Sequence, residues 1–356
     1  MRGLLILLLL AIPGFGAWGN GYTYRSSITI DHTKVPNTDQ ANFPVLIAGT
    51  YTDLKHTTHS GFVTDLNGYD IAFYSDAAGT TALYWEIESY NHETGAIVAW
   101  VKVPTVATAS DTVIYMFFGN ASVSTFQSTV ATVWSNGFVA VHHLPDGTTA
   151  LSALDSTSND NDGTLNLMYE VAGKIDGGAT TDGGDIALPG TNFPSGAASR
   201  SMSVWLYKAA LGSEQVAYSY GNSGTGLLFG ITISAANNVT FAGYAADVDS
   251  GVSLSATTWT HVAVTFDGTT IRTYVNGSAG ATGTPTLNTG TTYWYLGRFG
   301  GGLAWSGRLD EARLATSVRS ADWISTEYAN QNDPGTFYAV GTKAENSARR
   351  RVVITQ

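Results

Sequence analysis

The sequence predicts an all-β protein made of two antiparallel β-sandwiches, of jelly-roll type, in tandem. First, 44% of the 356 residues are hydrophobic and only 13% are charged, which is too apolar for a disordered chain. Second, 40 residues are glycine, and threonine, serine, valine and tyrosine are frequent, as in strands and turns. Third, short apolar or alternating runs recur between turn residues along most of the chain.

Residues 1–16 are expected to form a secretory signal peptide. Arg2 supplies the positive start, residues 4–12 are apolar, and Pro13 ends that run. Small residues then precede a cleavage site before Ala17. The run is too short to cross a bilayer as a helix, and no later segment is long and apolar enough. We therefore expect an exported protein, secreted or held at the cell surface, without a membrane span after signal removal.

Charge and cysteine content exclude several classes of protein. The net charge is −11, and the absence of a basic stripe argues against nucleic acid as a partner. A divalent cation is the more natural counter-charge. The chain has no cysteine, which excludes a disulfide scaffold, a thiol nucleophile and a cysteine-based zinc site.

The first domain is predicted to span residues 17–125. Its apolar runs read as six strands, separated by turn residues such as Asn67-Gly68 and Pro104. These strands are expected at residues 23–30, 43–48, 69–75, 82–90, 95–103 and 111–119. Residues 126–150 have no sustained period and are interpreted as a junction.

The second domain is predicted to span residues 151–342, with one helix at residues 319–330. Ser320 is the expected N-cap of that helix, and Asp322 complements its positive end. A strand at residues 336–341 is expected to close a sheet of this domain, and residues 343–356 to form a mobile tail. Further strands are expected at residues 201–207, 226–234, 238–245, 258–268, 270–277, 291–299 and 308–315.

The two halves resemble two known families. The second half resembles the laminin-G-like, concanavalin A-like lectin/glucanase sandwich, through residues 155–164, 173–179, 201–207, 259–277 and 307–323. The first half resembles a secreted bacterial and archaeal domain of unassigned function, through residues 24–25, 28–35, 43–47, 70–73, 86–90 and 98–104. The resemblance implies a second domain that binds a glycan or an extracellular protein, often with calcium, although the same sandwich also carries glycosidases.

The stretch DSTSNDNDGT at residues 155–164 is a candidate calcium loop. An EF-hand is excluded, because the position that requires a bidentate glutamate holds Tyr169. By the family resemblance, Asp155 is the candidate ligand in the loop and Asp310 its candidate partner from across the fold. Two alternatives stay open: the stretch is an ordinary polar turn, and Asp310 holds loop amides.

No catalytic residue is predicted. A retaining glycosidase needs two carboxyl groups about 5–5.5 Å apart. Glu86 and Glu88 share a strand face but are expected to be structural, and Asp310 and Glu311 are expected to point to opposite faces. The adjacent His142 and His143 would diverge on a strand, which is poor geometry for chelation.

Two groups are candidate ligand-binding residues, because sugars are met by exposed aromatic rings with polar side chains nearby. One is Tyr244 with Asp247, and the other is Trp305 with Arg308. Packing in a core is the alternative for each aromatic ring. The sequence thus predicts a non-catalytic exported recognition protein that binds a glycan or surface protein, with calcium as its candidate cofactor. The alternatives are a structural surface or appendage component without a ligand, and a glycoside hydrolase of the concanavalin A-like fold.

Overall fold

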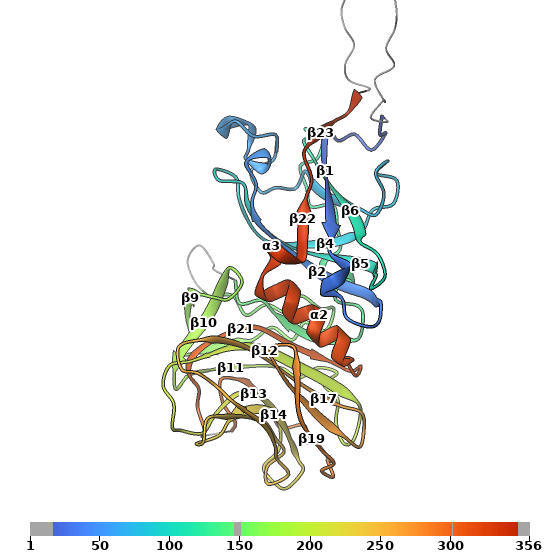
Figure 1. Ribbon diagram of the computed structural model, residues 1–356. Coiled ribbons are helices and arrows are strands. Elements are labelled where there is room, and N and C mark those ends of the chain that lie inside the picture. Colours follow the sequence, from blue (N-terminus) through green and yellow to red (C-terminus); the bar gives the residue numbers. More distant parts are fainter. Residues whose placement is uncertain (1–16, 146–150, 301, 348–356) are drawn as a thin grey trace, which may run out of the picture.

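A computed structural model describes residues 17–145, 151–300 and 302–347 of the chain, and it confirms the all-β class (Figure 1). The expected signal peptide and most of the expected tail lie outside these residues. Two sandwiches are stacked along the molecule, with a helix between them (Figure 1). Among the described residues, no helix is long and apolar enough to cross a membrane.

The first sandwich consists of two antiparallel sheets. One has the strand order β22-β1-β6-β3, with β23 also paired to β1, and the other has the order β2-β5-β4. Alternation of buried and partly buried residues, as in β1, turns one face of each sheet toward a shared core. The strands are β1 (Tyr24–Ile30), β2 (Gln40–Thr50), β3 (Ile71–Tyr74), β4 (Tyr84–Asn91), β5 (Ala96–Val106) and β6 (Thr112–Phe118).

The second sandwich has an eight-stranded and a seven-stranded sheet. Their orders are β19-β18-β17-β12-β21-β10-β9, with β7 also paired to β21, and β16-β15-β14-β13-β20-β11-β8. The strands of the larger sheet are β7 (Phe138–His142), β9 (Tyr169–Ala172), β10 (Gly177–Asp182), β12 (Arg200–Lys208), β17 (Trp259–Phe266), β18 (Ile271–Val275), β19 (Ser278–Gly283) and β21 (Ser306–Ala315). Those of the smaller sheet are β8 (Thr164–Asn166), β11 (Asp185–Ala187), β13 (Gln215–Gly221), β14 (Leu228–Ile233), β15 (Asn238–Ala242), β16 (Val248–Ser253) and β20 (Tyr293–Leu296).

The end of the chain returns to the first sandwich. Helix α2 (Ala321–Asn332) is followed by the short helix α3 (Pro334–Phe337) and by strands β22 (Tyr338–Val340) and β23 (Ala344–Glu345). As expected, Ser320 caps α2, its side chain accepting a hydrogen bond from the Trp323 amide. Both final strands pair with β1.

This return corrects three expected boundaries. The strand expected at residues 336–341 completes the first domain rather than the second. The start of the tail, residues 344–345, is a strand. Part of the expected junction, residues 138–142, forms β7 in the second sandwich. The second sandwich is therefore inserted between the first six strands and the last two strands of the first sandwich.

Side chains from the returning segment satisfy the free edge of β2. The Leu46 amide donates to Asn330 Oδ1 at 2.7 Å, and Asn330 Nδ2 donates to the Leu46 carbonyl at 3.0 Å. The Tyr338 hydroxyl accepts from the Ala48 amide at 2.8 Å and donates to the Ala48 carbonyl at 2.9 Å. Because unpaired edge groups would otherwise be exposed or buried without partners, these contacts make the chain end an integral part of the first sandwich.

We predict that removing residues 334–356 destabilises the first sandwich. The deletion removes β22, β23 and the Tyr338 contacts, so the melting temperature should fall by about 10 °C or more, because each kcal/mol lost shifts it by roughly 2–8 °C. Thermal unfolding followed by circular dichroism measures this. A chain lacking only residues 348–356 is the control, and equal melting temperatures for the two truncations would contradict the assignment.

Candidate functional site

A cluster of buried charged side chains lies where the two sandwiches meet, and we call it the junction cluster. It consists of Glu86 and Glu88 from β4, His143 just after β7, Glu311 and Arg313 from β21, and Glu327 from α2. All six side chains are at most 12% exposed. Since charges are rarely buried without partners, their pairing decides how this region works.

His143 lies at the centre of the carboxylates. Its Nδ1 is 2.8 Å from Glu311 Oε1 and 3.6 Å from Glu88 Oε2, and its Nε2 is 3.4 Å from Glu86 Oε2. The imidazole stacks on the Trp100 ring, with 5.3 Å between the ring centroids. The first sandwich thus supplies two of the three carboxylates around a histidine of the second.

Arg313 provides the second positive charge. Its guanidinium donates to Glu311 Oε2 at 2.6 Å and to Glu327 Oε1 at 2.7 Å. The same group lies over the rings of Trp100 and Trp134, at 4.4 and 4.9 Å from their centroids. One arginine therefore joins β21 to α2 while it packs against the aromatic rings of the first domain and the junction.

Uncharged side chains also donate hydrogen bonds to the two carboxylates of β4. Trp100 Nε1 donates to Glu88 Oε2 at 2.7 Å, and Trp134 Nε1 donates to Glu86 Oε2 at 2.6 Å. The Ser156 hydroxyl donates to Glu86 Oε1 at 2.7 Å. Both carboxylates accept hydrogen bonds from protein groups, while Glu88 Oε1 is buried without a hydrogen-bond partner.

A β-bulge in β21 brings two acidic residues to one side of the sheet. Glu311 has φ 50°, and the register with β12 shifts between the pairs Ser203–Arg313 and Trp205–Asp310. Leu309 and Ala312 both pack in the core of the second sandwich, so Asp310 and Glu311 lie together between two inward residues. The expectation that Asp310 and Glu311 point to opposite faces is therefore wrong.

The charges of the cluster hold protons on several groups. Burial alone would lower the pKa of His143, but Glu311, Glu86 and Glu88 outweigh it and hold that pKa well above the usual 6.5. Burial, with the charge of Glu311 added, raises the pKa of Glu88 well above its usual value, against the opposing effect of His143. Near neutral pH the cluster therefore contains an imidazolium.

Both calcium candidates accept hydrogen bonds from protein groups. The Asp155 carboxylate accepts hydrogen bonds from the amides of Val141, Thr157 and Asn161 and from the Thr157 hydroxyl, at 2.7–3.0 Å. Asp310 Oδ2 accepts from the amides of Lys174 and Ile175, at 2.8 and 2.9 Å. Among the described residues no interaction joins the two carboxylates, and Asp310 Oδ1 is buried without a hydrogen-bond partner. Calcium binding by these two residues stays a prediction.

Two other groups of side chains in the described part of the chain have the proximity of metal ligands. They are Asp31, His32 and Asp111 on the first sandwich, and Glu88, His143 and Glu311 in the junction cluster. Neither group contains Asp155 or Asp310. In the junction cluster, His143 and Arg313 already balance much of the negative charge.

Of the predicted ligand-binding residues, Tyr244 and Asp247 line one recess. Its volume is about 210 Å³, and Glu214, Phe299 and Leu303 also line it. The Tyr244 side chain is 44% exposed and meets the Phe299 ring edge to face, with 6.0 Å between centroids. The Asp247 carboxylate accepts a hydrogen bond from the Gly243 amide at 2.7 Å, which closes the turn that carries Tyr244.

The prediction for Trp305 as a ligand-binding residue is wrong. Its side chain is 0% exposed and packs in the core of the second sandwich, which was the alternative for every aromatic candidate. Arg308 is half-buried on β21, where its guanidinium lies 4.9 Å from the centroid of the Tyr207 ring. These two residues therefore do not form a site with each other.

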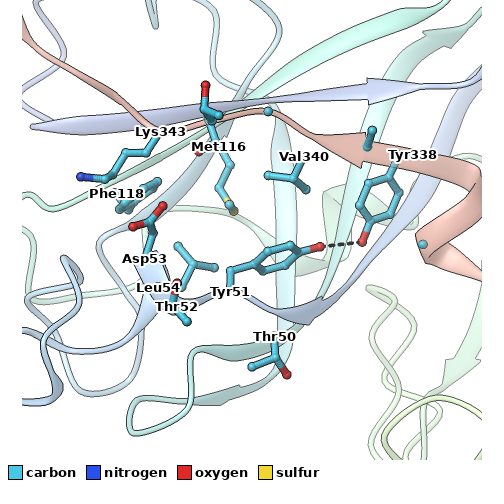
Figure 2. A pocket seen from close by; sticks show the side chains of 15 residues that line it. Thr50, Tyr51, Thr52, Asp53, Leu54, Met116, Phe118, Tyr338, Val340 and Lys343 are labelled. Carbon is cyan, nitrogen blue, oxygen red and sulfur yellow. Dashed lines mark hydrogen bonds between the residues drawn. The ribbon is translucent and has the colours of Figure 1, made fainter.

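Two further recesses in the first sandwich were missed by the sequence reasoning. One, of about 380 Å³, is lined by Glu86 and Glu88 together with Tyr69, Tyr90 and Phe126. The other is a cleft of about 510 Å³ beside Tyr51 and Tyr338 (Figure 2). The cleft combines residues 50–54, 116–118 and 335–343, which no local pattern connects.

Comparisons with known proteins agree with the expected order of domains. Residues 67–143 match the family described as "Domain of unknown function (DUF2341)", and residues 178–325 match the "Concanavalin A-like lectin/glucanases superfamily". The chain therefore carries a domain of unknown function followed by a concanavalin A-like domain. Comparison with curated proteins gives no match.

Solved structures similar to this chain include three proteins of different kinds. Domain 4 of AbnA, a GH43 extracellular arabinanase from Geobacillus stearothermophilus, in complex with arabinotriose, is 20% identical; the match covers 54% of this chain and 98% of that one, with a TM-score of 0.44. The binding domain of Paraclostridial Mosquitocidal Protein 1 is 13% identical, with 54% and 52% covered and a TM-score of 0.45. Trypanosoma rangeli sialidase in complex with sialic acid is 12% identical, with 72% and 46% covered and a TM-score of 0.43.

We predict that Arg313→Met costs about 3–5 kcal/mol of unfolding free energy, because it leaves the buried carboxylate of Glu327 without a cation and that of Glu311 with His143 alone. Urea denaturation measures the loss. Arg308→Met is the matched control on the same strand, since Arg308 makes a single 3.4 Å hydrogen bond to the Ala172 carbonyl. Equal costs for the two variants would show that the junction cluster does not stabilise the fold.

We also predict that stability falls as the pH rises above about 6.5, the unfolded-state value for histidine. The folded pKa of His143 lies above that value, so the folded state binds the extra proton, and its contribution is lost as the pH rises through the folded pKa. Glu311→Gln removes the largest charge that raises this pKa, and so should move the decline to lower pH. Urea denaturation across a pH series tests this, with Glu93→Gln, an exposed site, as control. An unmoved decline would refute the assignment.

Proposed function

We propose that the protein is a non-catalytic exported or cell-surface recognition protein, and that its concanavalin A-like domain binds a glycan at the Tyr244 recess. The observation that carries this proposal is an exposed aromatic ring beside carboxylates in a concave site. Tyr244 offers a ring face to the apolar C–H face of a sugar, while Glu214 and Asp247 offer acceptors for its hydroxyl groups.

The local backbone supports a binding role for this turn. Tyr244 and Ala245 have φ values of 54° and 62°, in the left-handed region that ordinary side chains rarely adopt. Two successive residues of this kind cost conformational free energy, and Asp247 holds the turn through the Gly243 amide. The strain keeps a large aromatic ring exposed at the rim of the recess instead of buried in the core.

We predict that Tyr244→Ala weakens glycan binding by about tenfold or more, since an aromatic contact and its apolar area are lost. A glycan array identifies the ligand, and calorimetry with the best soluble oligosaccharide gives the affinity. Tyr169→Ala is the matched control, because Tyr169 is 60% exposed on β9 of the other sheet. A wild-type protein that binds no glycan would favour the structural alternative, a surface component without a ligand.

Calcium assistance is a separate part of the sequence-based hypothesis, with Asp155 and Asp310 as its candidate ligands. Since protein donors occupy the Asp155 carboxylate and one oxygen of Asp310, we expect the melting temperature to be the same with excess chelator and with millimolar calcium. Differential scanning calorimetry measures this. A melting temperature that falls on chelation would contradict this expectation and would show that the folded chain binds calcium.

A glycoside hydrolase is the second candidate, and one observation favours it: Glu86 and Glu88 line the same recess. Against it, the Glu88 side chain is 1% exposed, and each carboxylate accepts a tryptophan N–H. We expect no release of reducing sugar from any oligosaccharide that the array identifies. If the protein does hydrolyse an oligosaccharide, and the activity is lost in Glu88→Gln but kept in Tyr244→Ala, the protein is a glycoside hydrolase instead.

A further inference from the structure

We infer that the first sandwich has a binding site of its own, and that the cleft beside Tyr51 takes a neutral saccharide. The cleft opens between the two sheets, where β2 ends at Thr50 and β22 forms the edge of the other sheet. Figure 2 shows Tyr51 reaching across it toward Tyr338, with Met116 above and with Asp53 and Lys343 at the opposite end. A volume of about 510 Å³ lies in the range of small-molecule sites.

Hydrogen-bond counting makes the Tyr51 oxygen an acceptor. The Tyr338 hydroxyl has one proton, which it donates to the Ala48 carbonyl, and it also accepts from the Ala48 amide. The 3.1 Å contact between the two phenol oxygens therefore has Tyr51 as donor. With its only proton engaged, the Tyr51 oxygen presents lone pairs alone, so a ligand must donate to it.

Asp53 is a second acceptor at the other end of the cleft. It is half-buried, and its carboxylate accepts no hydrogen bond from the described residues. Lys343, which also lines the cleft, holds its ammonium over the Phe62 and Tyr24 rings, at 3.5 and 4.5 Å from their centroids. One negative and one positive group leave the cleft with no net charge.

The wall between these ends is apolar. Leu54, Met116 and Phe118 are buried side chains that line the cleft, and Val340 adds to them from β22. Gly49 makes room for the phenol, since a β-carbon there would lie 2.8 Å from the Tyr51 oxygen. The site thus offers an apolar surface with acceptors at both ends.

These features favour a neutral polyol over other ligands. Lys343 disfavours a cation and Asp53 an anion, whereas sugar hydroxyl groups can donate to Tyr51 and Asp53 and accept from Lys343. The C–H face of a pyranose ring matches the apolar wall. An extended peptide is less favoured: it presents as many carbonyls as amides, and β22, three residues long, offers few backbone donors.

Hydrogen–deuterium exchange of the full chain tests the site without relying on binding at Tyr244. The probes are short neutral oligosaccharides at millimolar concentration, taken from the glycan array. We expect protection of residues 50–54 and 338–343. Asp53→Asn or Tyr51→Phe should reduce this protection strongly and weaken binding on the order of tenfold, because each variant removes one acceptor for a sugar hydroxyl group. Glu93→Gln is the control, and thermal unfolding verifies that each variant is folded.

The outcomes separate this site from the one proposed on the second sandwich. Protection confined to residues 242–247 and 299–303 would overturn the cleft site and leave the proposed function standing. Protection of the cleft alone would support the cleft site and overturn the proposed glycan site at Tyr244. Protection of residues 338–343 by neutral peptides and by no oligosaccharide would overturn the saccharide assignment, as would equal protection in Asp53→Asn and the unsubstituted protein.

Discussion

The pairing of buried charges at the junction is the constraint on which the rest of the structure depends. The first sandwich contributes to the junction cluster only the carboxylates of Glu86 and Glu88, whereas the second contributes His143 and Arg313 together with Glu311. Separating the sandwiches would take His143 away from the carboxylates of Glu86 and Glu88. Because an unpaired buried charge costs several kcal/mol, the two sandwiches are expected to stay together as one unit rather than to move on a linker. The aromatic rings around the cluster exclude water and strengthen the pairing.

The path of the chain also holds the two sandwiches together. Helix α2 lies between the sandwiches, with Glu327 in the cluster and Asn330 on the edge of β2 (Figure 1). One turn after Glu327, on the same face of the helix, Gln331 accepts a hydrogen bond from Trp205 Nε1 at 2.6 Å. One helix therefore satisfies polar groups of both sandwiches, and the strands that follow it complete the first. Insertion of one domain into another fixes the chain on both sides of the junction, which adds a covalent restraint to the electrostatic one.

The sequence predicts strands better than it predicts their partners. Of the strand predicted at residues 336–341, residues 338–340 form β22, whereas residues 336–337 belong to helix α3. Three paired residues carry no signal for which sheet they join, so the prediction places β22 in the wrong sandwich. The bulge at Glu311 could not be foreseen, because nothing in the sequence requires a left-handed glutamate. Tyr244 and Trp305 look alike in sequence, each an aromatic residue near charged ones. Only the fold separates them, since a left-handed turn exposes one ring and the sandwich core buries the other.

A rigid junction also changes what two recesses can achieve together. If each sandwich holds a saccharide, the distance between the two sites is set by the packing of the sandwiches and not by the statistics of a flexible linker. The second binding event then has a high effective concentration for a polymer whose repeat spans that distance, and almost none for a polymer that cannot reach both sites. Short oligosaccharides would bind weakly at either recess. A protein built in this way discriminates by spacing along an extended glycan, which suits the recognition of a surface more than the capture of a soluble sugar.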